Sequence, residues 1–328
     1  MGNASLKKIA VLTSGGDAPG MNAAIRAVVR TANYHKIECV GVRGGYTGLI
    51  EGNFTKMGPR SVSNIINLGG TILRSARSKE FRTEEGRQKA FEQCQKNGID
   101  ALVCIGGDGT FTGAKIFAEE FGVKVIGVPG TIDNDIFGTD FTIGYDTALN
   151  TAMEAIDKIR DTATSHNRVF FIEVMGRDAG FIALNSGIAS GALDILIPEK
   201  KDSLEDLFET FEKAQKRGKT SSIVIVAEGE RLASTYELAE QTKQKFPDYD
   251  IRVSILGHIQ RGGAPSCADR VLASRMGYGA VVGLMKGLTN VMAGIRSNDL
   301  VFTPIEDAIK KHNEINQDLL QIAEILAM

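Results

Sequence analysis

Two acidic residues stand two positions apart directly after an apolar run, in the stretch PGTIDND at residues 129–135. The run before them, KVIGV at 124–128, is typical of a buried parallel strand, so the acids would lie where that strand ends. Phosphoryl transfer needs mainly positioning, charge stabilisation and one base for the incoming hydroxyl. Asp133 is the candidate base, Asp135 would hold a metal or orient Asp133, and Thr131 would donate to the transferring group. The competing interpretation is an ordinary turn rich in Asp and Asn.

Two glycine-rich stretches could bind phosphate, TSGGDAPGMN at 13–22 and IGGDGT at 105–110. The first matches neither G-x-x-x-x-G-K-[ST] nor G-x-G-x-x-G. Both still lead from a predicted strand into a predicted helix, where backbone N–H groups and the helix dipole can meet an anion. A carboxylate in such a loop would repel the ligand unless a cation stood between them, so Asp108 is a candidate Mg²⁺ ligand. The alternative is that Asp108 is the N-cap of the helix predicted from Thr110.

The second half of the chain supplies cationic residues beside predicted strand ends. Arginines next to glycine turns suit bidentate binding of a phosphate, although an isolated arginine is more often a solvated surface residue. Glu228, at the end of SSIVIVAE, suits a sugar hydroxyl. His258 is either a buried structural histidine or part of a site within GHIQRGG. The four arginines that together favour a phosphate site are Arg168, Arg177, Arg252 and Arg261.

These residues need a scaffold, and the chain alternates short apolar runs with longer amphipathic ones. Strands are predicted at 8–13, 37–42, 100–106, 124–129, 168–174, 194–199, 221–227, 250–256 and 291–297. Helices are predicted at 22–35, 84–98, 110–122, 148–165, 203–218 and 312–328, the fifth with a capping-box-like start at Ser203 and Asp206. Continuous β-branched runs separated by helices indicate parallel strands that are buried on both faces. The predicted fold class is therefore α/β with mainly parallel sheets.

In such sheets ligands bind outside the C-terminal ends of the strands. The glycines of this chain cluster at those ends, which tight turns alone would explain for some of them. Seven or more such ends favour close approach of the backbone to a ligand at several. The glycines concerned are Gly15, Gly16, Gly44, Gly45, Gly106, Gly107, Gly109, Gly130, Gly176, Gly229, Gly262 and Gly263.

Composition narrows the function classes. The chain has 328 residues, enough for two α/β domains, and its formal net charge of −2 argues against binding to nucleic acid. Its four cysteines are scattered without a C-x-x-C pair, as expected of reduced thiols in a cytosol. We expect no signal peptide, no myristoylation signal and no membrane span, and hence a cytoplasmic location.

Six stretches, in order, resemble the bacterial-type ATP-dependent 6-phosphofructokinase family. They are LTSGGDAPGMNAAIR, SAR at 75–77, IGGDGT, PGTIDNDI, EVMGR and LGHIQRGG, and the resemblance runs from about Lys8 to Arg275. It implies phosphoryl transfer from MgATP to the 1-hydroxyl of fructose 6-phosphate, the committed step of glycolysis. The enzyme would be a phosphotransferase acting on an alcohol, with Mg²⁺ as its metal.

The resemblance also implies roles for individual residues. Asp133 would be the base, with Thr131, Asp135, Arg77 and Arg177 as its catalytic neighbours. ATP and Mg²⁺ would be held by Gly15, Gly16, Arg77, Ser78, Gly107, Asp108, Gly109 and Thr110, with Asp108 as the metal ligand. Fructose 6-phosphate would be held by Thr131, Asp133, Arg168, Met175, Gly176, Arg177, Glu228, Arg252, His258 and Arg261.

The family further implies two Rossmann-like three-layer domains with the active site in the cleft between them. The ATP-binding domain would span residues 1–143 and about 258–308, and the sugar-phosphate domain 144–257 and about 309–328. The positions of Arg168 and Arg252 reach a neighbouring subunit's active site in this family. A homotetramer whose active sites are completed across subunits is therefore expected.

Two glycines indicate the phosphoryl donor. Pyrophosphate-using relatives carry Asp and Lys at the positions of Gly109 and Gly130. A carboxylate at 109 would crowd and repel the α-phosphate of ATP, and a lysine at 130 would suit a small, dense anion. Both glycines favour ATP.

The effector site for ADP or phosphoenolpyruvate, which bacterial members form between subunits, is only partly matched. Basic residues are retained at Arg26, Arg30, Arg160 and Lys219. The chain departs from the family at Asn64 in place of Asp, at Leu193 (next to Asp194) in place of a metal-holding Glu, and at Thr220 and Ser221 in place of a Lys-His pair. We expect intact catalysis with weakened or altered control by these effectors.

Three other functions are alternatives for such a sequence. A pyrophosphate-dependent kinase, or one acting on a different sugar phosphate, would share the fold. A catalytically inactive regulatory subunit would usually have lost its base, but Asp133, Asp108 and Arg77 are all present. A dinucleotide-binding oxidoreductase would need G-x-G-x-x-G after the first strand, which SGGDAPG does not supply.

Overall fold

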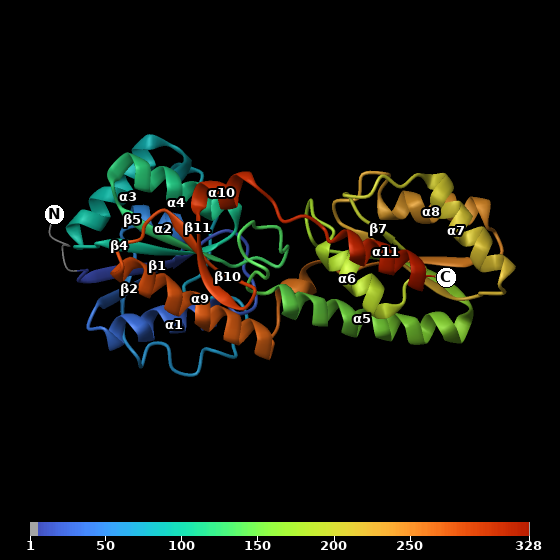
Figure 1. Cartoon of the computed structure of the whole chain (residues 1–328), viewed down its shortest axis with the longest axis horizontal. Coiled ribbons are helices and arrows are strands. Elements are labelled where there is room, and N and C mark those ends of the chain that lie inside the picture. Colours follow the sequence, from blue (N-terminus) through green and yellow to red (C-terminus); the bar gives the residue numbers. More distant parts are fainter. Residues whose placement is uncertain (1–5, 328) are drawn as a thin grey trace. The chain divides into compact units, whose positions relative to one another are not determined.

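The computed structural model describes residues 6–327, which form two compact units, each built from separate segments of the chain (Figure 1). Unit 1 comprises residues 6–132, 136–147 and 261–313, and unit 2 comprises 133–135, 148–260 and 314–327. The sequence analysis places the boundaries between the two domains after residue 143, after about residue 257 and after about residue 308. It also places residues 133–135 in the first domain. The expectations of no signal peptide and no myristoylation signal concern the N-terminus. Residues 1–5 lie outside the described part of the chain.

Unit 1 is built on a seven-stranded sheet in the order β11-β10-β5-β4-β1-β2-β3. Five neighbouring strands run parallel: β1 (Lys8–Thr13), β2 (Glu38–Val42), β4 (Ala101–Gly106), β5 (Lys124–Pro129) and β10 (Val291–Arg296). Two antiparallel strands close the edges, β3 (Phe54–Met57) against β2 and β11 (Asp299–Pro304) against β10. The predicted fold class, α/β with mainly parallel sheets, is confirmed, but the sequence analysis missed both edge strands.

Helices cover both faces of this sheet (Figure 1). One face carries α1 (Met21–Tyr34) and α9 (Cys267–Met285), which pack directly on each other. The two backbones come close because Gly277 has no side chain: a Cβ there would lie 2.7 Å from the Ala24 carbonyl oxygen. The other face carries α2 (Gly45–Glu51), α3 (Glu84–Lys96), α4 (Asp108–Phe121) and α10 (Ile305–Lys310). The apolar faces of these helices, including Phe111 and Phe117 of α4, form a buried apolar core against the sheet.

Unit 2 contains a smaller sheet whose four strands are all parallel, in the order β7-β8-β6-β9. The strands are β6 (Arg168–Val174), β7 (Asp194–Leu196), β8 (Ser222–Ala227) and β9 (Asp250–Ile255). Its helices are α5 (Tyr145–His166), which starts in unit 1, α6 (Phe181–Ser190), α7 (Leu204–Lys216), α8 (Thr235–Lys245) and α11 (Gln317–Leu326). Figure 1 shows α7 and α8 over one face and α5 and α6 over the other.

The helix ends follow local chemistry. The predicted capping box is confirmed, because Ser203 Oγ accepts from the Asp206 N–H while the Asp206 carboxylate accepts from the Ser203 N–H. The last helix starts at Gln317, with Asn316 as its N-cap, rather than at His312. It packs on α6, yet Ile325 and Leu326 of its apolar stripe stay exposed in the single chain.

Between residues 6 and 327, none of the helices combines the length and apolarity required to cross a bilayer. All four cysteines are free thiols. Burial raises the pKa of Cys39, Cys94 and Cys104 to about 12, whereas Cys267 is exposed. The three buried thiols therefore act as small apolar core residues.

Candidate functional site

Three predicted loops meet at one edge of the unit 1 sheet. Strands β1, β4 and β5 are neighbours in parallel register, with Thr13 opposite Ile105 and Gly106 opposite Pro129. Their C-terminal ends therefore reach the same line, and each leads into a glycine-bearing loop. These loops contain Gly15 and Gly16 after β1, Gly107–Thr110 after β4, and Gly130 and Thr131 after β5.

Hydrogen bonds join the three loops. Thr110 Oγ1 donates to the Ser14 carbonyl at 3.0 Å, and the Ser14 N–H donates to the Ile105 carbonyl at 3.0 Å. The Gly130 N–H donates to the Gly106 carbonyl at 3.0 Å. Gly106 permits this packing, since a Cβ there would lie 2.3 Å from Thr110 Oγ1. The loops thus form one cross-linked surface that presents backbone to a ligand.

Helix α4 starts within the second loop. Gly107 is its N-cap and Asp108 is its first helical residue, so the alternative of Asp108 as the N-cap is wrong. The N–H groups of a first helical turn have no partner inside the helix, and the helix dipole makes that end electropositive. Phosphate would therefore meet an attractive surface here. The partly buried carboxylate of Asp108 is the hard oxygen ligand that Mg²⁺ prefers.

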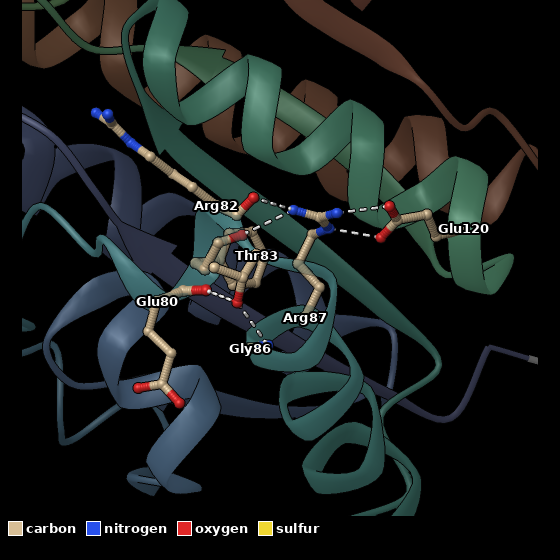
Figure 2. Close-up of polar contacts among 7 residues, drawn as sticks. Glu80, Arg82, Thr83, Gly86, Arg87 and Glu120 are labelled. Carbon is tan, nitrogen blue, oxygen red and sulfur yellow. Dashed lines mark hydrogen bonds and ion pairs between the residues drawn. The ribbon is translucent and has the colours of Figure 1, made fainter.

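A buried arginine, Arg87, fixes the segment that directly follows Arg77 and Ser78; Figure 2 shows its contacts with Glu120 and with the Arg82 carbonyl. The Arg87 guanidinium is paired with both carboxylate oxygens of Glu120, at 2.5 and 2.6 Å. It also donates to the carbonyls of Phe81 and Arg82 at 3.1 and 2.8 Å. Two adjacent helices, α3 and α4, thereby hold the short η1 helix (Glu80–Arg82) that follows Ser78. Arg77 itself is exposed.

An aromatic stack supports the same segment. Tyr46 of α2 lies on Phe81 with ring centroids 4.0 Å apart and planes 9° apart, and its hydroxyl donates to the Thr110 carbonyl at 2.5 Å. The Phe81 N–H donates to Ser78 Oγ at 3.2 Å. The segment from Ser78 to Phe81 is thus tied to the loop after β4.

The two acids of the TIDND stretch lie on either side of a strained residue. Asn134 has φ 57°, a left-handed conformation that Asn tolerates better than most residues. Asp133 is buried, with 7% of its surface exposed, and Asp135 is partly buried. Within unit 1, the carbonyl of Thr131 accepts from Thr142 Oγ1 at 2.7 Å. The burial of Asp133 distinguishes this stretch from an ordinary solvated surface turn.

A second set of predicted residues meets at the C-terminal edge of the unit 2 sheet. The Glu228 N–H donates to the Val174 carbonyl at 2.9 Å, and the Glu228 carboxylate accepts from the Arg177 N–H at 3.2 Å. Arg177 has φ 56° and an exposed guanidinium, with its side chain 72% exposed. Gly229 allows this approach, because a Cβ there would lie 2.1 Å from the Arg177 carbonyl oxygen.

The neighbouring residues belong to the same edge. Met175 and Gly176 follow β6, and the Met175 N–H donates to the Gln260 side chain at 3.3 Å. His258 lies in the η2 helix (Gly257–Arg261) after β9 and is exposed, which excludes a buried structural histidine. Arg261 belongs to unit 1, where it donates to the Asp17 carbonyl at 3.2 Å.

Arg168 and Arg252 do not join that edge, which corrects the expectation of four arginines beside one phosphate site. Arg168 is the first residue of β6, and it pairs with Asp250, the first residue of β9. The Asp250 carboxylate is bound by both arginines, at 2.7 Å from Arg168 Nε and 2.9 Å from Arg252 Nε. Arg168 stands six residues before the end of β6, about 20 Å along the strand at ~3.3 Å per residue. These arginines and Arg177 cannot bind one small phosphate within a single chain.

Comparison with known proteins gives these sites a family. The family model described as Phosphofructokinase matches residues 8–284. The chain is 57% identical over 321 residues to the ATP-dependent 6-phosphofructokinase of Cytophaga hutchinsonii, covering 98% of both chains. It is 54% identical over 323 residues to ATP-dependent 6-phosphofructokinase 1 of Thermus thermophilus, covering 98% of this chain and 100% of the relative. The chain belongs to the phosphofructokinase family.

Solved structures agree. The chain matches the structure of phosphofructokinase from Saccharomyces cerevisiae with a TM-score of 0.88 and 38% identity. The match covers 93% of the present chain and 45% of the longer yeast chain. A pyrophosphate-dependent phosphofructokinase from Nitrosospira multiformis matches with a TM-score of 0.85 at 20% identity, which shows the shared fold alone.

The residues predicted for an effector site are divided between the two units of this phosphofructokinase. Arg26 and Arg30 lie on α1 in unit 1. Arg160 and Lys219 lie in unit 2, where burial and the positive charge of Arg160 lower the pKa of Lys219. Leu193 is 4% exposed in the unit 2 core, so that position offers no metal ligand. Asn64 is exposed with φ 58°, and Thr220 donates to the Asn167 side chain at 3.0 Å.

Several buried polar residues that support the loops were missed by the sequence analysis. The side chain of Asn22 donates to the carbonyls of Leu68 and Gly69 and accepts from the Ile72 N–H, fixing the segment that leads to Arg77. The Asp269 carboxylate accepts from Gly144 N–H and from Thr147, and burial raises its pKa. The clearest signal available was the position of Asn22 inside the quoted stretch TSGGDAPGMN.

Proposed function

We propose that this phosphofructokinase transfers the γ-phosphoryl group of MgATP to the 1-hydroxyl of D-fructose 6-phosphate, giving fructose 1,6-bisphosphate and ADP. The observation that carries the proposal is the joined surface of three glycine loops at one edge of unit 1, with the N-terminus of α4 among them. The names of relatives that are 54–57% identical over their whole length support the same activity. A cytoplasmic location belongs to the proposal, since glycolytic enzymes work there.

The reaction needs one base and a stabilised phosphoryl group. The 1-hydroxyl oxygen attacks the γ-phosphorus, the bond to the β,γ-bridging oxygen breaks, and the hydroxyl proton passes to the Asp133 carboxylate. Thr131 and Arg77 would donate to the transferring group, with Asp135 orienting Asp133. The burial of Asp133 beside the left-handed Asn134 supports these roles, because a base must be held within hydrogen-bond reach of its proton.

Mg²⁺ is the metal that this reaction requires. Asp108 fits it, since its carboxylate stands at the first residue of α4 beside backbone N–H groups that suit phosphate. When bound with ATP, the ion would neutralise charge on the phosphate oxygens. Gly15, Gly16, Ser78, Gly107, Gly109 and Thr110 would complete the donor site.

Unit 2 would hold the acceptor. Arg177 offers an exposed guanidinium, and Glu228 offers a carboxylate suited to a sugar hydroxyl, at neighbouring strand ends. Met175, Gly176, His258 and Arg261 complete the proposed set.

Arg168 and Arg252 would act in the active site of a neighbouring subunit. Their place at the N-terminal edge of the unit 2 sheet supports this, because it separates them from Arg177 of the same chain. We infer a homotetramer whose active sites are completed across subunits. A chain that sediments as an active monomer would contradict this part of the proposal.

Two glycines support ATP as the donor. Gly109 is exposed, and a Cβ placed on it would meet no atom within 4 Å, so the space beside it is open to a nucleotide. At Gly130 a Cβ would lie 3.1 Å from Met21 Cε and 3.2 Å from Ile105 Cγ2, so a lysine there would crowd its neighbours.

Control by ADP or phosphoenolpyruvate would be weakened or altered. The burial of Leu193 in the core supports this, since a metal-holding carboxylate is replaced by an apolar side chain. Full activation by ADP at low fructose 6-phosphate would contradict it.

The direct test compares turnover of fructose 6-phosphate with MgATP and with Mg-pyrophosphate. Turnover with MgATP alone is expected. Turnover with pyrophosphate would mean that Gly109 and Gly130 do not decide the donor. A folded protein that is inactive with both donors on fructose 6-phosphate and on other sugar phosphates would instead indicate a regulatory subunit.

A further inference from the structure

The two glycines of the loop after β1 are glycines for different reasons. Gly15 has φ 83°, a left-handed conformation that L side chains rarely adopt. Gly16 is not among the residues with positive φ, so its backbone alone would accept any amino acid. It is also exposed, so neither strain nor core packing explains the missing side chain.

The space that a side chain on Gly16 would take is filled by Arg261. A Cβ on Gly16 would lie 2.8 Å from Nη1 and 3.3 Å from Cζ of that guanidinium. Nη1 also donates to the carbonyl of Asp17, the next residue in the loop, at 3.2 Å. The guanidinium therefore occupies the space beside the Gly16–Asp17 backbone and is held there by a hydrogen bond.

We propose that Gly16 is a positioning residue for Arg261: it lacks a side chain so that this guanidinium can lie on the loop after β1. The inference rests on the proposed function, in which Gly16 belongs to the donor site and Arg261 binds fructose 6-phosphate. It adds that the donor loop itself sets the position of a ligand of the acceptor phosphate. A change at Gly16 should then affect the acceptor through Arg261.

The substitution Gly16→Ala is suited to test this, because the fold should tolerate it. The three atoms nearest to such a Cβ all belong to the far end of a long flexible side chain, which can move aside. The expected result is a displaced guanidinium in a protein that unfolds at the wild-type temperature.

A double-mutant cycle measures the coupling. KM for fructose 6-phosphate is determined at saturating MgATP for wild type, Gly16→Ala, Arg261→Ala and the double variant. Gly16→Ala alone should raise this KM by about tenfold, as expected when a charged donor is displaced. Arg261→Ala should raise it on the order of 10- to 100-fold. In the Arg261→Ala background, Gly16→Ala should add less than about twofold, because no guanidinium remains to be displaced.

A Gly16→Ala effect of equal size in both backgrounds would overturn the inference, since the side chain would then act without Arg261. So would an unchanged KM for fructose 6-phosphate in the single variant. Failure of the proposed function is distinguishable, because wild type itself would then show no turnover of fructose 6-phosphate with MgATP.

A second readout avoids dependence on turnover. The dissociation constant for fructose 6-phosphate, from the ligand-dependent rise in the unfolding temperature, gives the same cycle if Arg261→Ala is too slow to assay. Gly58→Ala is the matched control, because Gly58 has no positive φ and a Cβ there would meet nothing within 4 Å. Its KM and dissociation constant should equal those of wild type.

Discussion

The two sheets of this phosphofructokinase end in the same way but carry different chemistry. At the C-terminal edge of the unit 1 sheet, the loops after β1, β4 and β5 present glycine backbone, a helix N-terminus and the acid Asp108. At the corresponding edge of unit 2, the loops present the side chains of Arg177, Glu228 and His258. Backbone donors suit a long polyphosphate that carries its own Mg²⁺, whereas charged side chains suit one phosphate with sugar hydroxyls beside it. On the proposed function, one architecture serves two ligands through its loops.

The supports of the two edges differ as well. Unit 1 fixes its loops with buried side chains from distant segments, among them Asn22, Arg87 and Asp269. Unit 2 relies on contacts between the functional residues themselves, such as the Arg177 N–H to Glu228, together with the fully buried Gln260. Substitutions behind the donor loops should therefore act at a distance, while those in unit 2 should act directly.

The largest effect is expected from substitution of Asp133, the proposed base. Asp133→Ser should lower kcat by roughly 10²- to 10⁴-fold, because the acceptor hydroxyl loses its base. Steady-state kinetics with fructose 6-phosphate and MgATP measures this, and each KM should stay within about threefold of wild type. Asp157→Ser, which removes an exposed carboxylate of α5, is the control. A kcat within tenfold of wild type would rule out Asp133 as the base.

A smaller and more selective effect is expected at Gly109. Gly109→Asp should raise KM for ATP on the order of 10- to 100-fold while KM for fructose 6-phosphate is unchanged, because a carboxylate would face the nucleotide phosphates. The fold should tolerate the change, since a Cβ there meets no atom within 4 Å and an acid in the first turn suits the helix dipole. Gly109→Asn separates charge from size. An equal rise in KM for ATP and KM for fructose 6-phosphate would contradict the assignment of the two ligands to different edges.

Arg87 tests action at a distance. Arg87→Met should cost about 3 kcal/mol in the free energy of unfolding, because it leaves Glu120 and two carbonyls without their donor. KM for ATP should rise about threefold to tenfold through the loosened Arg77 segment, and KM for fructose 6-phosphate should not change. Denaturant unfolding and steady-state kinetics measure the two effects. Arg87→Lys keeps the positive charge but loses the two parallel hydrogen bonds of the guanidinium to Glu120. If this variant has wild-type stability and KM for ATP, the geometry of the guanidinium is unimportant.

The smallest effect is expected at an acid of β7 that lies opposite Val224, in the middle of β8. Burial raises the pKa of Asp194, the first residue of β7, to about 6, with Asp202 and Asp206 adding to the rise and Lys200 opposing it. A raised pKa means that the folded state holds the proton longer, so stability falls as the pH rises from about 4 to about 6. With Asp194→Asn, the free energy of unfolding should fall by about 1–3 kcal/mol less between pH 4 and pH 6 than it does in wild type.

Chemical unfolding at pH 4, 5, 6 and 7 measures the difference between wild type and Asp194→Asn. Parallel curves for the two proteins would contradict the assignment to Asp194. Kinetic constants at pH 7 should be the same in both, because Asp194 belongs to neither the proposed donor site nor the proposed acceptor site.

Local patterns in the sequence predicted much of this arrangement. Apolar runs followed by glycine marked the strand ends, and Ser203 with Asp206 marked a helix start, because both depend on neighbours only a few residues away. The edge strands β3 and β11 were missed because they are short or partly exposed and lack a continuous buried run.

Residues whose role depends on distant partners could not be assigned from local patterns. Arg168 was grouped with the strand-end arginines although the predicted strand 168–174 begins with it. The parallel register of β6 and β9 then shows its partner, because it places Arg168 beside Asp250. Asp269 accepts a hydrogen bond from the Thr147 N–H at the start of α5, more than 100 positions away in the sequence. The sequence pattern predicts that Gly16 is a phosphate-loop glycine. Its proximity to Arg261 joins distant parts of the sequence, so no local pattern could show it.

The division between a donor edge and an acceptor edge is tested most directly by one matched pair, Arg77→Ala and Arg177→Ala. Both remove an exposed arginine, one from each unit, and KM is measured for both substrates in each variant. We predict that Arg77→Ala raises KM for ATP and Arg177→Ala raises KM for fructose 6-phosphate, each on the order of tenfold or more, with the other KM within about threefold. The reverse pattern, or equal rises in both constants for both variants, would contradict the account.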